Sequence, residues 1–222
     1  LETVLPYADR IYFDNCDKIV EAREMCARSN KELVALLPRF DPLDDFAETE
    51  YPVMVNTPGQ YHACRKSPRI YASSNMNFFN SYFPLKLYQA TLSTELSRRE
   101  ISDLVKHSGI RTEVMVFGRM ELMVTRDPGM DNCVLKDEKD ISFPVYRDRY
   151  GYSRILNSAD LNLIGNIGEL GRMGVDSVGF DLRKRPPALA RAVCEACVSP
   201  ASESKLEEIC GGFTRGLYQR GV

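Results

Sequence analysis

Side chains that can transfer protons or hold a substrate recur directly after short apolar runs of this sequence. Carboxylates can act as general acids and bases or hold a divalent metal, and arginine and asparagine can bind a substrate through hydrogen bonds. Loops are polar in any protein, so one such residue alone would be ordinary solvation. Together they predict a site, and the candidates are Asp14, Arg39, Asn56, Gln60, Asn75, Asn77, Asn80, Glu95, Arg119, Glu121, Asn157, Asp181 and Arg183.

Two carboxylates, Glu95 and Glu121, are the candidates for catalysis. Glu95 follows the apolar run 87–92, and Glu121 lies just beyond the run 112–117. They could form an acid–base pair or hold a divalent metal, while Arg119 anchors or polarises the substrate. The alternative for Glu95 is a structural role near the start of a helix, whose dipole favours a carboxylate. The candidate substrate-binding residues are Asn75, Asn77, Asn80, Asn157 and Arg183.

Other catalytic arrangements are missing from the sequence. A zinc site of the usual peptidase kind needs two or three histidines at helical spacing, and the chain has only His62 and His107. We expect His107 to close a helix, where a cation complements the dipole. The sequence contains no Gly-x-Ser-x-Gly elbow and no glycine-rich phosphate loop after a strand.

The seven cysteines are scattered along the chain. Cys194 and Cys197 have the spacing of metal ligands, and Cys210 follows, but Cys197 and Cys210 fall on apolar helical stripes where free cysteine packs as a small core residue. We place Cys16 on such a stripe as well. Cys133 lies in a polar loop and is the thiol that we expect to be accessible, although a nucleophilic role would need a cationic neighbour.

Net charge, hydropathy and cysteine number argue against several classes of protein. The 222 residues carry a formal net charge of −2, which gives no basic face for duplex nucleic acid. We expect the basic runs at 147–154 and 183–185 to be solvated surface. No apolar stretch is long enough to cross a membrane, and the odd, scattered cysteines indicate a reducing cytoplasm. The chain begins without Met, so we expect a piece of a longer polypeptide with flanking domains.

Apolar runs alternate with helical periodicity, which predicts an α/β fold with a mainly parallel sheet. The segment 143–156 is too polar for an eighth barrel strand and is interpreted as a hairpin insertion. We therefore predict an irregular TIM-like (β/α) barrel, as a single domain over 1–222. The seven predicted strands are 9–14, 33–38, 52–56, 69–73, 87–92, 112–117 and 177–182.

Several helix ends can be predicted from individual residues. Ser97 and Glu100 have the spacing of a capping box. Ser158 is a plausible N-cap of a helix that Gly174 would end. The proline pair at 186–187 suits the first turn of another helix, and a last helix is expected near 205–210.

Five segments in order resemble the collagenase-like peptidase family of unassigned catalytic type. The segment 113–126 (EVMVFGRMELMVTR) resembles the family signature. The flanking segments 75–80 (NMNFFN), 92–97 (LSTELS), 157–161 (NSADL) and 213–216 (FTRG) resemble its other conserved blocks. The resemblance implies a barrel fold.

The chain departs from the signature where the family carries cysteines, because Glu121 and Pro128 stand there. Iron–sulfur clusters need four thiolate ligands, so we expect no equivalent cluster. The cofactor stays unknown, with a divalent metal possible. The variant around Gly118 resembles the long, multi-domain branch of the family that lacks the signature cysteines.

The resemblance implies two activities, and a third possibility follows from the missing cysteines. The first is a peptidase-like hydrolase acting on a peptide or protein. The second is a factor for RNA hydroxylation, whose phosphate contacts would come from Arg147, Arg149, Arg154 and Arg183. The third is a barrel without catalysis that serves as a scaffold in a larger chain.

Overall fold

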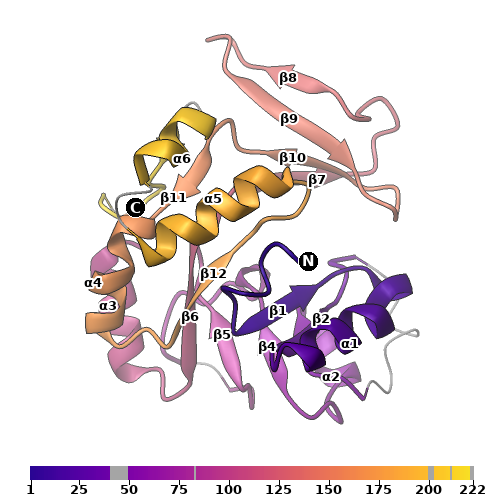
Figure 1. Ribbon diagram of the computed structural model, residues 1–222, viewed down its shortest axis with the longest axis vertical. Helices are drawn as coiled ribbons and strands as arrows, with labels where there is room; N and C mark the ends of the chain where they lie inside the picture. The colour runs from indigo at the N-terminus through magenta and orange to yellow at the C-terminus, as the bar shows by residue number, and fades with distance from the viewer. Residues whose placement is uncertain (41–49, 83, 200–202, 211, 221–222) are drawn as a thin grey trace.

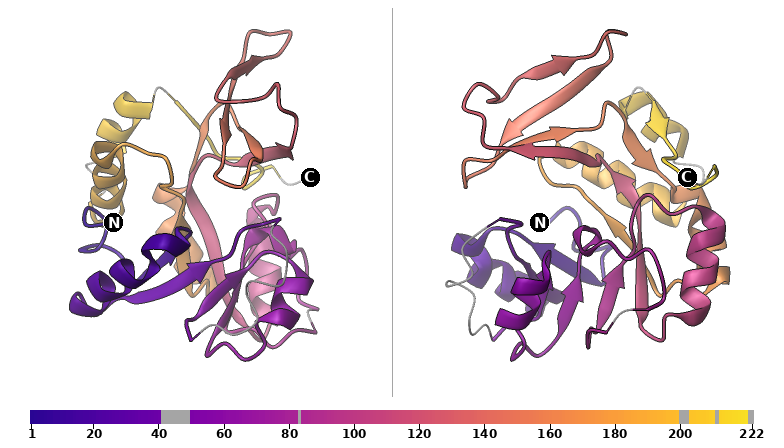
Figure 2. Two further views of the ribbon diagram at one scale, coloured as in Figure 1. Left: turned by 90° about the vertical axis from the view of Figure 1, so that its right-hand side faces the viewer. Right: turned by 180° about the vertical axis from the view of Figure 1, so that it is seen from behind.

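The computed structural model describes residues 1–40, 50–82, 84–199, 203–210 and 212–220. Seven strands lie in the order β1-β2-β3-β4-β5-β6-β12, and each neighbouring pair in this series is parallel. The sheet curls strongly into a half-barrel (Figures 1 and 2), which confirms the predicted α/β class and TIM-like architecture. The strands are β1 (Arg10–Phe13), β2 (Glu32–Leu36), β3 (Val53–Val55), β4 (Ile70–Ala72), β5 (Gln89–Thr91), β6 (Arg111–Gly118) and β12 (Ser177–Phe180).

Helices cover the outside of the sheet (Figure 1). Ile101 of α3 and Leu170 of α4 pack in one cluster with Val114 of β6, and Val193 of α5 packs with Leu206 of α6. Burying such a side chain fully contributes roughly 1.5–3 kcal/mol. The helical elements that follow β3 and β4 are only six and three residues long. The helices are α1 (Ile19–Arg28), α2 (Pro58–Ala63), α3 (Arg98–His107), α4 (Ile167–Met173), α5 (Pro187–Val198) and α6 (Glu203–Cys210), with 3-10 turns η1 (Cys16–Lys18), η3 (Ser74–Met76) and η4 (Ile164–Asn166).

A polar network fills the interior of the half-barrel between β1, β5, β6 and β12. The Glu113 carboxylate, only 3% exposed, accepts hydrogen bonds from Tyr12 of β1 at 2.9 Å and from Gln89 of β5 at 2.9 Å. Thr91 donates to its other oxygen at 2.8 Å, and Ser177 of β12 donates at 3.3 Å. Because β1 and β6 lie five strands apart in the sheet, the contact from Tyr12 to Glu113 shows that the curl brings distant strands face to face.

One predicted helix start is wrong. Ser158 is not an N-cap, because Asp160–Asn162 forms strand β11, which pairs antiparallel with the end of β6 and parallel with β13 (Phe213–Thr214). The helical residues begin only at Ile164. Gly174 does end the helix, with a left-handed φ of 94° that glycine adopts without steric cost. The prolines do open α5.

The region between β6 and β11 is a four-stranded antiparallel sheet that projects from the half-barrel (Figure 1). The predicted hairpin insertion is confirmed by the pairing of β9 with β10, and β7 and β8 extend it on either side. Several apolar side chains of this sheet are exposed to solvent, including Met123, which is 58% exposed. The strands are β7 (Glu121–Thr125), β8 (Val134–Lys136), β9 (Ser142–Arg147) and β10 (Ser153–Leu156).

The predicted capping box of α3 is confirmed. The Ser97 hydroxyl accepts from the Glu100 backbone N–H, and the Glu100 carboxylate accepts from the Ser97 backbone N–H at 2.8 Å. The Ser97 hydroxyl also donates to the Glu100 carboxylate at 2.6 Å, and this hydrogen bond, followed by the one from the Ser97 backbone N–H, lowers the pKa of Glu100. His107 is the last residue of this helix, as predicted.

The Ser97→Ala variant is expected to lose about 1 kcal/mol of unfolding free energy, because one free N–H of the first turn loses its acceptor. In the wild type, the lowered pKa of Glu100 means that its contribution is present above the unfolded-state pKa and is lost as the pH falls through the folded-state pKa. Urea unfolding of the wild type and the variant at pH 7 and at pH 3 measures the unfolding free energy and its dependence on pH. The variant should show the smaller pH dependence, and an equal dependence would contradict it.

Candidate active site

The carboxyl ends of the parallel strands meet at one edge of the half-barrel, and the candidate residues follow these ends. Active sites of parallel barrels lie at this edge. Asp14, Arg39 and Asn56 follow β1, β2 and β3, and Asn75 and Asn77 lie in or next to η3 after β4. The remaining candidates on this edge are Glu95 after β5, Arg119 after β6, and Asp181 and Arg183 after β12.

Buried amides tie together the ends of β2, β3 and β4. Asn56 Oδ1 accepts hydrogen bonds from Ser73 Oγ and Asn75 Nδ2, both at 2.8 Å. The side-chain Oε1 of Gln60 accepts from the Asn56 backbone N–H at 2.7 Å, and the side-chain Nε2 of Gln60 donates to the Pro38 backbone carbonyl. Asn56 and Gln60 are 6% and 2% exposed. This cluster holds the edge rigid, and Asn75 belongs to it.

Asn77, Asn80 and Glu95 lie at the surface of the same edge. Asn77 has a left-handed φ of 55°, and Asn80 accepts from the Tyr82 N–H at 3.0 Å. The loop after β4 contacts the loop after β5 through a backbone hydrogen bond from Ser93 to Phe78. The exposed Glu95 carboxylate has no hydrogen-bond or ion-pair partner among the described residues. It is therefore free to contact a ligand or water.

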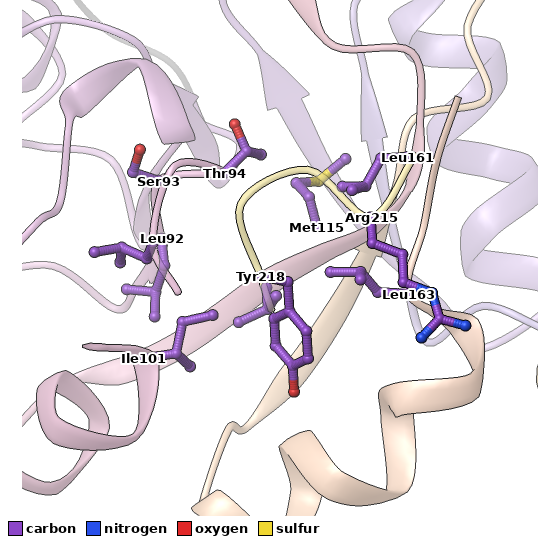
Figure 3. A pocket seen from close by; sticks show the side chains of 11 residues that line it. Leu92, Ser93, Thr94, Ile101, Met115, Leu161, Leu163, Arg215 and Tyr218 are labelled. Atoms are coloured by element: carbon purple, nitrogen blue, oxygen red, sulfur yellow. The ribbon is translucent and has the colours of Figure 1, made fainter. Parts of the chain in front are cut away.

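A small cavity lies beside the loop that carries Glu95 (Figure 3). Its volume of about 10 Å³ is close to the minimum for one water molecule. Figure 3 shows Ser93 and Thr94 on one side and Arg215 and Tyr218 of the carboxyl-terminal segment on the other. Apolar side chains from β6, β11 and α3 complete the lining, so a substrate-sized ligand does not fit inside.

Arg119 and Arg185 share one buried carboxylate. Arg119 Nη2 lies 3.5 Å from Asp160 Oδ2, and Arg185 Nη2 donates to Asp160 Oδ1. Asp160 is only 2% exposed. We interpreted Arg185 as part of a solvated basic run, and this is wrong, because its side chain is 16% exposed.

Glu121 joins the antiparallel sheet to the half-barrel. Arg39, which follows β2, donates to one oxygen of Glu121, and Arg154 of β10 donates to the other. Arg154 also bonds to Asp148 at 2.8 Å. Burial works against the charged form of Arg154, but the attraction of Glu121 and the hydrogen bonds to Glu121 and Asp148 together outweigh it and raise the pKa. Both Glu121 oxygens are thus already occupied by guanidinium groups.

Asp181 and Arg183 form a further pair after β12. Arg183 donates two hydrogen bonds to the Asp181 carboxylate, at 2.9 and 2.6 Å, and lies 3.8 Å from Asp14. The attraction of Asp181 raises the pKa of Arg183. Burial alone would raise the pKa of Asp181, but Arg183 lowers it. Asn157 lies between β10 and β11, where its backbone N–H donates to the Met120 carbonyl at 2.8 Å and its side-chain Oδ1 accepts from the Ser158 N–H at 2.8 Å.

Residues 66–199, more than half of the chain, match the sequence model of Peptidase family U32. The chain belongs to peptidase family U32. No curated protein and no solved structure matches it. The eight candidates that were assigned a catalytic or substrate-binding role all lie inside the segment that the U32 model matches: Asn75, Asn77, Asn80, Glu95, Arg119, Glu121, Asn157 and Arg183.

Two of the three predicted catalytic residues follow adjacent strands of the half-barrel, and the third lies in the antiparallel sheet. Within the described part of the chain, no hydrogen bond or ion pair joins Glu95, Arg119 and Glu121 to one another. Glu95 and Arg119 follow the adjacent strands β5 and β6. Glu121 instead faces Arg39 and Arg154. The sequence interpretation missed Asp160, which we placed at a helix start, and Glu113, which is hidden in an apolar run.

The cysteines of this U32 chain correct one prediction. All seven are free, and Cys16 is the exposed one, whereas Cys133 is partly buried. Cys16 lies in η1, before the helix on whose apolar stripe we placed it. Burial raises the pKa of Cys197 to about 12, as expected for a thiol packed at the core. Among the described residues, no group of three or more His, Cys, Asp and Glu side chains could hold a metal.

The four arginines proposed for RNA contacts each lie within 4.0 Å of a carboxylate. Arg147 pairs with Asp131 at 3.8 Å and Arg149 with Asp17 at 3.3 Å. Arg154 and Arg183 belong to the pairs described above. Each of these carboxylates offsets the positive charge that contacts to a phosphate backbone require, so the geometry does not favour the RNA alternative. No described helix is long and apolar enough to cross a membrane.

Proposed function

We propose that this U32 domain is a peptide hydrolase whose reaction takes place at the carboxyl edge of β5 and β6. One observation carries the proposal: Glu95 and Arg119 follow adjacent parallel strands, and the Glu95 carboxylate is exposed and without a protein partner in the described residues. Membership of a peptidase family supports a peptide or protein as the substrate.

In the proposed reaction, Glu95 removes a proton from a water molecule, whose oxygen attacks the peptide carbonyl carbon. Arg119 donates hydrogen bonds to the carbonyl oxygen as it gains negative charge. The C–N bond then breaks, and the leaving amine takes up the proton that Glu95 removed from the water, which returns Glu95 to its carboxylate form. Exposed amides such as Asn77 and Asn80 can hold the peptide backbone.

Glu121 has a different part in this proposal. Its two oxygens accept from Arg39 and Arg154, so it positions those arginines instead of transferring a proton. The described residues offer no three-ligand metal group, and no step of the proposal passes through a metal. The single-domain interpretation, the long family branch and the reducing cytoplasm stay predictions, the last supported by the free cysteines.

The Glu95→Gln variant is expected to hydrolyse a fluorogenic peptide library with kcat reduced roughly hundredfold or more and KM nearly unchanged, because a general base contributes about that factor. The matched control is Glu138→Gln, an exposed carboxylate on the antiparallel sheet, which should retain wild-type rates.

Two outcomes would contradict the proposal. Hydrolysis that is unchanged in the Glu95→Gln, Glu121→Gln double variant would remove both carboxylates from the mechanism. A folded wild-type protein that cleaves no peptide in the library would instead favour the scaffold alternative.

A further inference from the structure

Two guanidinium groups at the carboxyl edge are balanced by a single buried carboxylate. Asp160 lies between Arg119 and Arg185, and the side chains of the two arginines are 20% and 16% exposed. Charges removed from water need close countercharges, or their desolvation is not offset. The contact from Arg119 to Asp160, at 3.5 Å, is at the limit of a hydrogen bond. The group therefore has about one positive charge in excess.

Arg119 also has an unused donor inside the protein. Its Nε is the only fully buried side-chain nitrogen or oxygen of the described residues that has no hydrogen-bond partner. Buried donors are nearly always paired, and an unpaired one calls for an explanation such as a missing ligand. Its location beside a shared carboxylate indicates that the ligand carries an acceptor oxygen.

The other ionisable groups nearby neither balance the excess positive charge nor accept a hydrogen bond from Arg119 Nε. Asp181 lies close enough to Arg185 to be influenced by it, but its carboxylate accepts two hydrogen bonds from Arg183. Besides burial, the charges of Asp160, Arg185 and Arg119 shift the pKa of the Cys210 thiol. Burial and the charge of Asp160 raise the pKa of its thiol, although Arg185 and Arg119 oppose this, so the thiol stays protonated and neutral at neutral pH.

We propose that Arg119 and Arg185 form a binding site for a carboxylate group of the peptide substrate. The inference rests on the proposed function and specifies the substrate. A guanidinium matches a carboxylate with two parallel N–H donors, and one excess positive charge matches the single negative charge of a carboxylate. A phosphate group at neutral pH carries more charge than the site would neutralise.

The test measures the affinity of the full chain for three short peptides by titration calorimetry. One peptide ends in a free carboxylate and has neutral side chains, the second is its carboxyl-terminal amide, and the third is the amide with one internal aspartate. We expect the free acid, the aspartate peptide or both to bind roughly tenfold more tightly than the neutral amide, since hydrogen bonds to charged groups are worth about that factor. Which acid binds identifies the source of the carboxylate.

Variants separate a binding site from a structural ion pair. Arg119→Met and Arg185→Met should each abolish the preference for the acidic peptide, whereas the exposed Arg172→Met should keep it. Asp160→Asn removes the competing carboxylate and should tighten binding of the acidic peptide, which loss of a purely structural contact would not do. Circular dichroism confirms folding, and Arg119→Lys serves if Arg119→Met does not fold.

The inference is overturned if the wild type binds the acid and amide peptides equally or binds neither, or if inorganic phosphate binds more tightly than the acidic peptides. Its failure can be distinguished from failure of the proposed hydrolysis. Glu95→Gln should still prefer the acidic peptide without cleaving it. A wild type that prefers the acid but cleaves nothing would retain the carboxylate site and refute the hydrolase.

Discussion

Replacing Glu113 by leucine is expected to lower the free energy of unfolding by roughly 3 kcal/mol or more. The carboxylate accepts hydrogen bonds from Tyr12, Gln89, Thr91 and Ser177 in the interior of the half-barrel. Leucine would leave the Tyr12 and Thr91 hydroxyls without this acceptor, and each such buried group costs about 1–3 kcal/mol. Urea unfolding followed by circular dichroism measures the loss.

Two further variants make this prediction specific. Glu113→Gln keeps the shape and one acceptor oxygen, so its loss should be smaller than that of leucine. Glu138→Ala removes an exposed carboxylate and should stay within about 0.5 kcal/mol of the wild type. Equal stability of Glu113→Leu and Glu138→Ala would mean that the interior network does not hold the strands together.

The same network predicts a loss of stability at alkaline pH. Burial, and next the charge of Glu113, raise the pKa of Tyr12 above its ordinary value. A raised folded-state pKa means that the stabilisation is complete below the unfolded-state pKa of about 10 and is lost as the pH rises through the folded-state pKa.

Replacing Gly118 by alanine is expected to destabilise the protein by roughly 2–4 kcal/mol. Gly118 ends β6 with a φ of +139°, which side-chain-bearing residues rarely adopt. A Cβ atom there would lie 2.8 Å from Asp181 Cβ and 2.9 Å from the Asp181 carbonyl oxygen, both closer than van der Waals contact allows. The clash would push the end of β12 away from β6, because the Asp181 N–H bonds to the Phe117 carbonyl at 2.9 Å.

Gly171→Ala is the matched control for this substitution. Gly171 lies within α4, and a Cβ there would meet nothing within 4 Å. Alanine in a helix is more favourable than glycine, so this variant should gain about 0.5–1 kcal/mol. If thermal unfolding ranked the two variants equally, or Gly118→Ala as the more stable, the close approach of β6 and β12 would not matter for folding.

The parallel strands could be predicted because each is a short apolar run between turn residues. β11 could not, because the three residues Asp160–Asn162 are too few for an alternating pattern to be informative, and Ser158 before them has the side chain of a helix cap. The strand exists through its pairing with β6 and β13, which are distant in sequence. Tertiary pairing decides such short elements, and local propensity does not.

The sequence could predict the edge of the sheet on which the candidate site lies, but not the contacts between its side chains. Strand ends identified Glu95 and Arg119, since parallel strands bring their carboxyl ends together. The partners of these residues depend on side chains far apart in the sequence, and neither composition nor spacing reveals them. Asp160 lies 41 residues from Arg119 and meets it only because β11 pairs beside the end of β6. Glu113 lies within the predicted apolar strand 112–117, and nothing in the sequence indicates that its carboxylate faces the interior of the half-barrel.

The hydrogen-bonded side chains around Glu113 form a floor beneath the carboxyl edge. Because hydrogen-bonded side chains occupy the space between β1 and β6 at this level, we expect a ligand to reach and leave the carboxyl edge on that same side. A cleaved fragment leaving the rim would meet the next substrate on its way in. Product inhibition that is competitive with substrate is the kinetic behaviour that this one-sided architecture imposes on a hydrolase of the proposed kind.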